Sequence, residues 1–169
     1  MPARTRTARA GWCALAGCIG LLAAACKADI PFGDPAPPLA FEAAADQSLS
    51  TIEVLTCPGE RVLRLTLTRD EGTNGVMKPG AVLWEIAATS SSTAAIFHPA
   101  KPTAGFDTIT APVLPLTGDI DIEVKTTLTS MSAGISTDVL RTDAMTLGGA
   151  DRTKLTAALE KTVRHNHCG

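Results

Sequence analysis

The chain has 169 residues, of which 45% are hydrophobic and 19% are charged, with 15 Lys and Arg against 17 Asp and Glu. This is enough apolar material for one domain of ordinary size, and it excludes a disordered chain, a collagen repeat and a protein with several membrane spans. The balance of charge argues against nucleic acid as a partner, because proteins that bind it usually carry a basic excess.

The first 25 residues have the organisation of an export signal. Three arginines, Arg4, Arg6 and Arg9, precede an uncharged stretch over residues 10–25. A membrane-spanning helix needs roughly 20 apolar residues, so this stretch is short for a span and suits the apolar core of a signal peptide. An uncleaved membrane anchor is the alternative. Removal of the signal would leave 12 basic residues against the 17 acidic ones, a net charge of −5.

The end of this signal is more specific. Residues 22–26 are Leu-Ala-Ala-Ala-Cys, and they resemble the lipobox of bacterial lipoproteins, in which small residues precede a cysteine. The resemblance implies that Cys26 is acylated and becomes the first residue after cleavage, so that two acyl chains hold the protein on the outer face of the cell membrane. Ala23 departs from the family, which usually has Leu or Val there. Ala23 and Ala25 also fit ordinary signal peptidase, which would leave an unmodified, secreted protein.

The cysteines predict one disulfide in the exported domain. Cys13 and Cys18 leave with the signal and Cys26 is the predicted lipidation site, so two of the five cysteines remain, Cys57 and Cys168. An exported chain meets oxidising surroundings, in which an even remainder is expected to pair. The bond would close a loop of roughly 110 residues, for which the chain-entropy model gives about 4–5 kcal/mol. It would fasten the C-terminal segment to the first core strand.

Residues 26–49 are predicted to be a tether. Four of them are prolines, which lack the backbone N–H that regular structure needs, and Pro-rich segments form semi-rigid spacers. A short helical turn over residues 41–45 is compatible with the sequence. The alternative is that the apolar residues of this segment pack against the domain as an arm: Phe32, Leu39 and Phe41.

From about residue 50 the pattern predicts β-strands. Apolar and polar residues alternate in four segments, and because successive side chains of a strand point to opposite faces, each segment is typical of a half-buried strand. The residues expected on the buried faces are Ile52 and Val54; Leu63, Leu65 and Leu67; Val82, Trp84, Ile86 and Ala88; and Ile120, Ile122, Val124 and Leu128. Shorter strands are expected at residues 94–97, 139–140 and 145–147. Glycine and proline pairs separate the strands as turns.

The C-terminus changes to a helical period. Apolar and small residues recur at steps of three and four between Leu155 and Val163, which is typical of one stripe of an amphipathic helix. Asp151 is expected to cap its start, while Arg164 and His165 suit the negative end of its dipole. Strands separated by turns and followed by one helix predict a mainly β fold. We therefore expect an antiparallel β-sandwich over residues 50–169 with one C-terminal amphipathic helix.

No motif for catalysis stands out, so we expect a protein that is not an enzyme and has no catalytic residues and no cofactor. The sequence holds neither a Gly-x-Ser-x-Gly elbow nor a glycine loop for phosphate. Ser130, Ser132 and Ser136 flank Gly134 in an expected loop, and nothing distinguishes one of them. The carboxylates over residues 70–71 and 119–123 are typical of turns and of a solvated strand face.

The histidines define the main alternative, a secreted hydrolase or a metal-binding protein with a site near His98 or near His165 and His167. Imidazole and thiolate ligands suit zinc or copper, and Cys168 follows His167 directly. The spacing matches no strong motif, however, and a disulfide-bonded Cys168 cannot bind a metal as a thiolate. No metal site is therefore predicted.

The favoured function is that of an exported, lipid-anchored protein of the bacterial cell envelope with a non-enzymatic binding or structural role. The expected partners are the membrane, through Cys26, and an unidentified envelope protein or ligand. A third interpretation is an exported inhibitor-type module that uses the loop at residues 70–79, because long loops on rigid sheets often carry contacts. The chain has four Phe and no Tyr, so few aromatic side chains are available for recognition of carbohydrate or protein.

Overall fold

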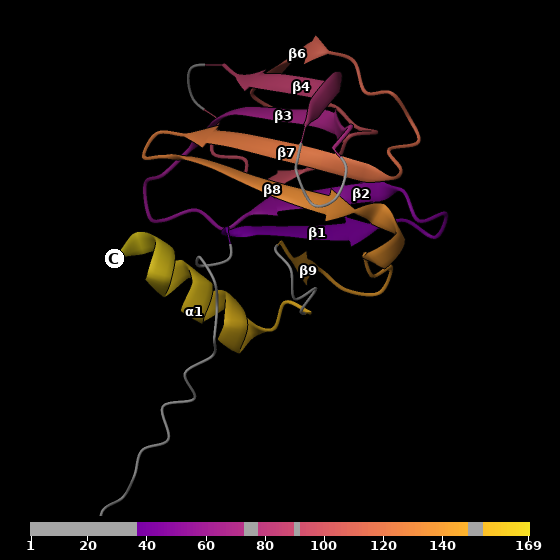
Figure 1. Ribbon diagram of the computed structural model, residues 1–169. Coiled ribbons are helices and arrows are strands. Elements are labelled where there is room, and N and C mark those ends of the chain that lie inside the picture. Colours follow the sequence, from indigo (N-terminus) through magenta and orange to yellow (C-terminus); the bar gives the residue numbers. More distant parts are fainter. Residues whose placement is uncertain (1–36, 73–77, 90–91, 149–153) are drawn as a thin grey trace, which may run out of the picture. The chain divides into compact units, whose positions relative to one another are not determined.

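The computed structural model describes residues 37–72, 78–89, 92–148 and 154–169, which all belong to one compact unit (Figure 1). The predicted signal, the predicted lipidation residue Cys26 and the first part of the predicted tether lie outside the described residues. Within the described ranges, no helix is both long enough and apolar enough to span a bilayer.

The described residues form nine strands, a short 3₁₀-helix and one α-helix, numbered in chain order. The strands are β1 (Leu39–Ala43), β2 (Leu49–Val54), β3 (Val62–Asp70), β4 (Pro79–Ala88), β5 (Ile96–Phe97), β6 (Phe106–Thr110), β7 (Asp119–Thr126), β8 (Ser130–Ser136) and β9 (Thr146–Leu147). The helices are η1 (Thr137–Val139) and α1 (Ala157–Cys168).

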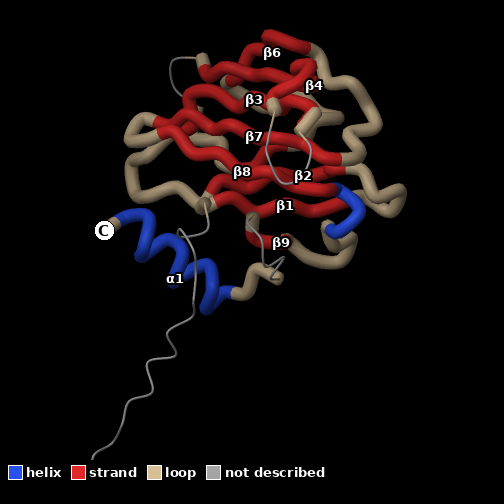
Figure 2. Tube along the Cα trace, viewed as in Figure 1, coloured by secondary structure: helices blue, strands red, loops and turns tan. Residues whose placement is uncertain are grey.

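The strands form two antiparallel sheets, as predicted. The smaller sheet has the strand order β5-β2-β1-β9, and the larger sheet has the order β6-β4-β3-β7-β8 (Figure 2). The fold is therefore mainly β and sandwich-like, with one helix at the C-terminus, which confirms the predicted fold class.

One apolar core lies between the two sheets. It combines side chains of the smaller sheet, such as Phe41 and Ile52, with side chains of the larger sheet, such as Leu65 and Ile122, all with no exposed surface. The alternation predicted for β7 is confirmed, because its apolar residues are buried and Glu123 is exposed. Complete burial of one such side chain contributes about 1.5–3 kcal/mol, so this core is the main source of stability.

A second, smaller apolar cluster attaches α1 to the smaller sheet. Val163 of the helix is buried against Leu55 and Leu147, and Leu155 and Leu159 pack partly buried around them. The helix accordingly lies beside β1 and β9 (Figure 1). The predicted helical stripe is thus present. The helix begins later than expected, with Thr156 as its cap, whose side chain accepts a hydrogen bond from the N–H of Leu159; the expected cap, Asp151, lies outside the described residues.

The prediction that the tether extends to residue 49 is wrong from Leu39 onward. Residues 39–43 form β1, which pairs with both β2 and β9, and Leu39 and Phe41 have no exposed surface. The helical turn expected over residues 41–45 is therefore absent. The alternative of a packed arm holds for Leu39 and Phe41, while Phe32 lies outside the described residues. The prolines end at Pro38, and the five-residue strand that follows is too short to show its alternation clearly.

Two β-bulges change which residues face the core. Leu63 was expected inside but is 38% exposed, because an irregularity between Val62 and Arg64 places Val62 in the core instead. Val82 was also expected inside and is 40% exposed, because the register shifts by one residue and buries Leu83. A bulge inserts one unpaired residue and reverses the alternation beyond it. The pattern of apolar and polar residues in the sequence does not show where such a bulge occurs.

Three further predictions are wrong near the second half of the larger sheet. Leu128 is 68% exposed, because β7 ends at Thr126 and Leu128 lies in the hairpin turn. The serines at 130, 132 and 136 lie on β8 and not in a loop. Residues 139–140 are not a strand, because Val139 ends the 3₁₀-helix η1 and Leu140 follows it, buried. Short strands rich in serine and glycine carry little of the apolar alternation on which the prediction depends.

Candidate functional site

The site forms around a tight turn between β2 and β3. The N–H of Glu60 donates to the carbonyl of Cys57 at 3.0 Å, and Gly59 between them has a φ of +81°. Proline followed by a residue with positive φ is the pattern of a type II turn, in which glycine is favoured because it lacks a Cβ. The turn holds Cys57 and Glu60 next to each other at the end of the sandwich that α1 reaches.

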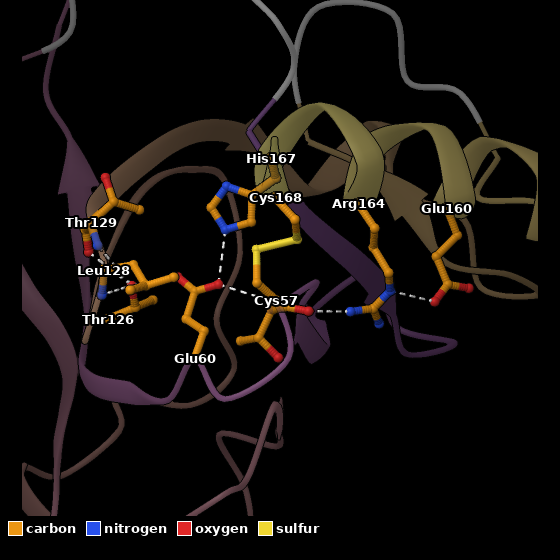
Figure 3. Close-up of a disulfide and its surroundings, with 10 residues drawn as sticks. Cys57, Glu60, Thr126, Leu128, Thr129, Glu160, Arg164, His167 and Cys168 are labelled. Atoms are coloured by element: carbon orange, nitrogen blue, oxygen red, sulfur yellow. Dashed lines mark hydrogen bonds and ion pairs between the residues drawn. A yellow bond between two sulfur atoms is a disulfide. The ribbon is translucent and has the colours of Figure 1, made fainter.

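Cys168, at the end of α1, lies at disulfide distance from Cys57. The two Cα atoms are 5.5 Å apart, which is ordinary for a bonded pair, and the bond joins the turn to the end of α1 (Figure 3). Cys57 is buried, whereas Cys168 is exposed. The two cysteines that the sequence predicted to pair, 111 positions apart along the chain, therefore lie together in the fold.

Glu60 is the centre of a buried hydrogen-bond network. Its Oε1 accepts a hydrogen bond from Thr126 Oγ1 at 2.5 Å, and its Oε2 accepts one from the backbone N–H of Cys57 at 2.8 Å. His167 Nε2 also lies 2.9 Å from Oε2 (Figure 3). The side chain of Glu60 has no exposed surface, while that of His167 keeps 13%. A carboxylate can remain buried only when both oxygens are hydrogen-bonded in this way.

These contacts set the acidity of Glu60. Burial by itself raises the pKa of its carboxyl, but the hydrogen bonds from Thr126, from the Cys57 N–H and from His167, together with the charge of His167, outweigh it. The pKa of Glu60 is consequently lowered from its ordinary value of 4.5. A carboxyl whose pKa is lower in the folded chain than in the unfolded chain stabilises the folded state at pH values above the unfolded-state pKa. This contribution is lost as the pH falls through the folded-state pKa.

Glu60→Gln is therefore expected to make unfolding less sensitive to acid. Below about pH 4.5, the ordinary value for Glu60, the unfolded wild-type chain binds a proton at this residue more readily than the folded chain does, so its stability falls. The variant cannot bind that proton. Urea unfolding at a series of pH values between about 6 and 3 measures how steeply the free energy of unfolding falls with pH. A pH slope in Glu60→Gln equal to that of the wild type contradicts the expectation.

Arg164 adds a polar attachment between α1 and the sheet. Its Nη1 donates to the carbonyl oxygen of Thr56 at 2.6 Å, and its Nε bonds Glu160 Oε1 at 2.9 Å (Figure 3). Burial and the charge of Glu160 raise the pKa of nearby Glu53, against the opposing effect of Arg164. Three side chains within five residues thus attach the last turns of α1 to the sandwich: Arg164, His167 and Cys168.

The structure separates the histidines that the sequence grouped as alternatives. His167 joins Cys57 and Glu60, and one ligand atom from each of these three lies within 4.8 Å of the others; in the described residues this is the only such group of three or more. His165 is exposed. His98 lies elsewhere, with Nδ1 3.3 Å from the carbonyl oxygen of Ser50. Of the two proposed locations, the one at the C-terminus is the one that forms a group of three possible ligands within the described ranges.

Sequence reasoning missed Glu60 and Thr126. Thr126 continues the buried alternation of β7 by one step, and Glu60 directly follows the Pro-Gly turn. The sequence context of each residue therefore gave a weak indication of its position. Neither indication shows that the two residues, 66 positions apart, meet. Their contact follows from the antiparallel pairing of Val62 with Thr126, which only the three-dimensional register reveals.

Two surface depressions lie in the described part of the domain. A hollow of about 390 Å³ on the outer face of the larger sheet is lined by Arg64, Thr66, Glu85, Glu123 and Lys125, with Arg64 and Glu85 in an ion pair. An apolar groove of about 280 Å³ near β4 and β6 includes Trp84 and Phe106 together with three prolines. The loop at residues 70–79 is described only in part, since residues 73–77 lie outside the described ranges.

Comparison with protein-family models, with curated proteins and with solved structures finds no match to this chain.

Proposed function

We propose that the chain is an exported, lipid-anchored protein of the bacterial cell envelope whose β-sandwich domain has a non-enzymatic binding or structural role. The observation that carries the proposal is the segment Leu-Ala-Ala-Ala-Cys at residues 22–26, which follows a short basic and then uncharged segment. The cysteine pair of the folded domain supports it, because a disulfide between distant residues persists in oxidising compartments and is rare in the cytosol.

The position of β1 limits how far an anchored domain could lie from its lipid. Twelve residues separate Cys26 from Leu39, the first residue of β1. Thirteen steps along the chain span at most about 45 Å. A lipid on Cys26 would consequently keep the sandwich close to the membrane, where its partners would be envelope components.

The outer face of the larger sheet supports a binding role. Its 390 Å³ hollow presents two basic and two acidic side chains around Thr66, a mixed arrangement that suits polar or zwitterionic ligands. The acidic excess of the mature chain gives no electrostatic attraction to anionic lipid, so membrane association would depend on the acyl chains.

Cys26→Ala is expected to move the protein from the membrane fraction to the soluble fraction or the medium. The substitution removes the thiol that would carry the lipid, and two acyl chains are what make such anchoring stable. Fractionation followed by immunodetection measures the distribution. Cys18→Ala is the matched control, because this cysteine leaves with the signal and its loss should not change the distribution. Retention of Cys26→Ala in the membrane would refute the lipid anchor.

A metal-binding role is the second candidate, and one observation favours it. Cys57, Glu60 and His167 gather three ligand atoms of the kinds that zinc prefers within 4.8 Å. Because Cys57 lies at disulfide distance from Cys168, this candidate depends on the oxidation state of the pair.

A further inference from the structure

We propose that reduction of the Cys57–Cys168 disulfide converts this cluster into a zinc site, with Cys57, Cys168, His167 and Glu60 as the four ligands. The inference concerns the folded domain alone and does not depend on the lipid anchor. It assigns the cluster two states: a covalent cross-link when oxidised, and a metal cross-link when reduced.

The distances require only small movements. Zinc binds sulfur at about 2.3 Å and nitrogen or oxygen at about 2.0–2.2 Å in a tetrahedron, so its donor atoms lie roughly 3–4 Å from one another. The donor atoms of Cys57, Glu60 and His167 are already within 4.8 Å of one another. His167 Nε2 and Glu60 Oε2, now 2.9 Å apart, need only separate slightly. Cys168, whose sulfur is bonded to that of Cys57, supplies the fourth donor.

The surroundings orient the ligands in advance. Thr126 and the backbone N–H of Cys57 hold the Glu60 carboxylate, which is the role that outer hydrogen bonds have in zinc sites. Cys57 and Glu60 come from one tight turn, and His167 and Cys168 come from the last turn of α1. Zinc would therefore join the same two elements that the disulfide joins, and its double positive charge would offset two of the three negative charges of the Glu60 carboxylate and the two thiolates.

The chemistry requires a two-electron reductant, which we specify as a dithiol. One of its thiolates attacks the sulfur of exposed Cys168, forming a mixed disulfide and releasing the Cys57 thiolate. Its second thiolate closes the reductant's own disulfide and releases the Cys168 thiolate. The two electrons pass from the dithiol to the cystine. Zn²⁺ then binds both thiolates with no change of its oxidation state, and the two protons of the dithiol go to solvent.

The test uses the full chain with Cys13, Cys18 and Cys26 replaced by serine, so that Cys57 and Cys168 are the remaining thiols. The protein is reduced with a dithiol, freed of it in the absence of air, and titrated with Co²⁺ and then Zn²⁺. We expect one Co²⁺ per reduced chain, a thiolate-to-cobalt charge-transfer band, and displacement by Zn²⁺. The oxidised protein should show no such band. If the reduced chain loses α1, added Zn²⁺ should restore its far-ultraviolet circular dichroism.

The variants distinguish this site from adventitious binding. His167→Ala should weaken Zn²⁺ at least about tenfold, since even groups that only orient a ligand contribute that much. His165→Ala is the matched control on the same turn of α1 and should bind as the wild type does. The proposal is overturned if the reduced chain binds no metal, if the oxidised chain binds it equally well, or if both histidine variants weaken binding to the same extent.

Discussion

Replacement of both Cys57 and Cys168 by serine is expected to lower the free energy of unfolding by about 4–5 kcal/mol, the value that the chain-entropy model gives for a loop this long. The two residues are separated by 111 positions, so the bond removes a large number of unfolded conformations. A domain of this size has a total stability of about 5–15 kcal/mol, so the loss would be a large part of it.

The loss should be greatest in α1. A helix of 12 residues is marginal on its own in water, and Val163 is its one buried residue in the described structure. Hydrogen exchange should therefore show that the amides of α1 lose protection before those of β3 and β7. Urea unfolding gives the global value. Cys18→Ser, in the predicted signal, is the control and should leave both measurements on the full chain unchanged; a global loss below about 1 kcal/mol would contradict the loop argument.

The parts of the fold that could be predicted are those with long, regular alternation. β7 shows this best, since Ile120, Ile122 and Val124 were expected inside and all have no exposed surface. The helix was recognised from its period, and the disulfide from counting the cysteines that lie outside the predicted signal and the predicted lipidation site. These features depend on local sequence and composition alone, so a single sequence carries them.

The parts that could not be predicted depend on neighbours in space. Bulges in β3 and β4 reverse the alternation, and their cause is the register with the adjacent strand. Glu60 directly follows the Pro-Gly turn in the sequence, and only strand pairing and the disulfide bring Thr126 and His167 to it. The cysteine pair of the site was therefore accessible from sequence, whereas the carboxylate at its centre was not.

Leu39→Ala is expected to destabilise the domain by about 2–5 kcal/mol, whereas Leu128→Ala should change stability by less than about 0.5 kcal/mol. Leu39 has no exposed surface and lies on β1, between β2 and β9. Its truncation would leave a cavity that the two packed sheets can fill only partly. Leu128 is 68% exposed in the turn after β7, so its truncation removes little buried surface.

Both variants replace a leucine by alanine, so the difference between their free energies of unfolding reports on the surroundings of the two leucines. Urea unfolding of both, followed by far-ultraviolet circular dichroism, gives the comparison. A tether that ended at residue 49 and a strand face that included Leu128 would produce the opposite order of stabilities. The order of the two values therefore tests whether residues 39–43 are a structural strand of the sandwich, and a larger loss for Leu128→Ala than for Leu39→Ala would show that they are not.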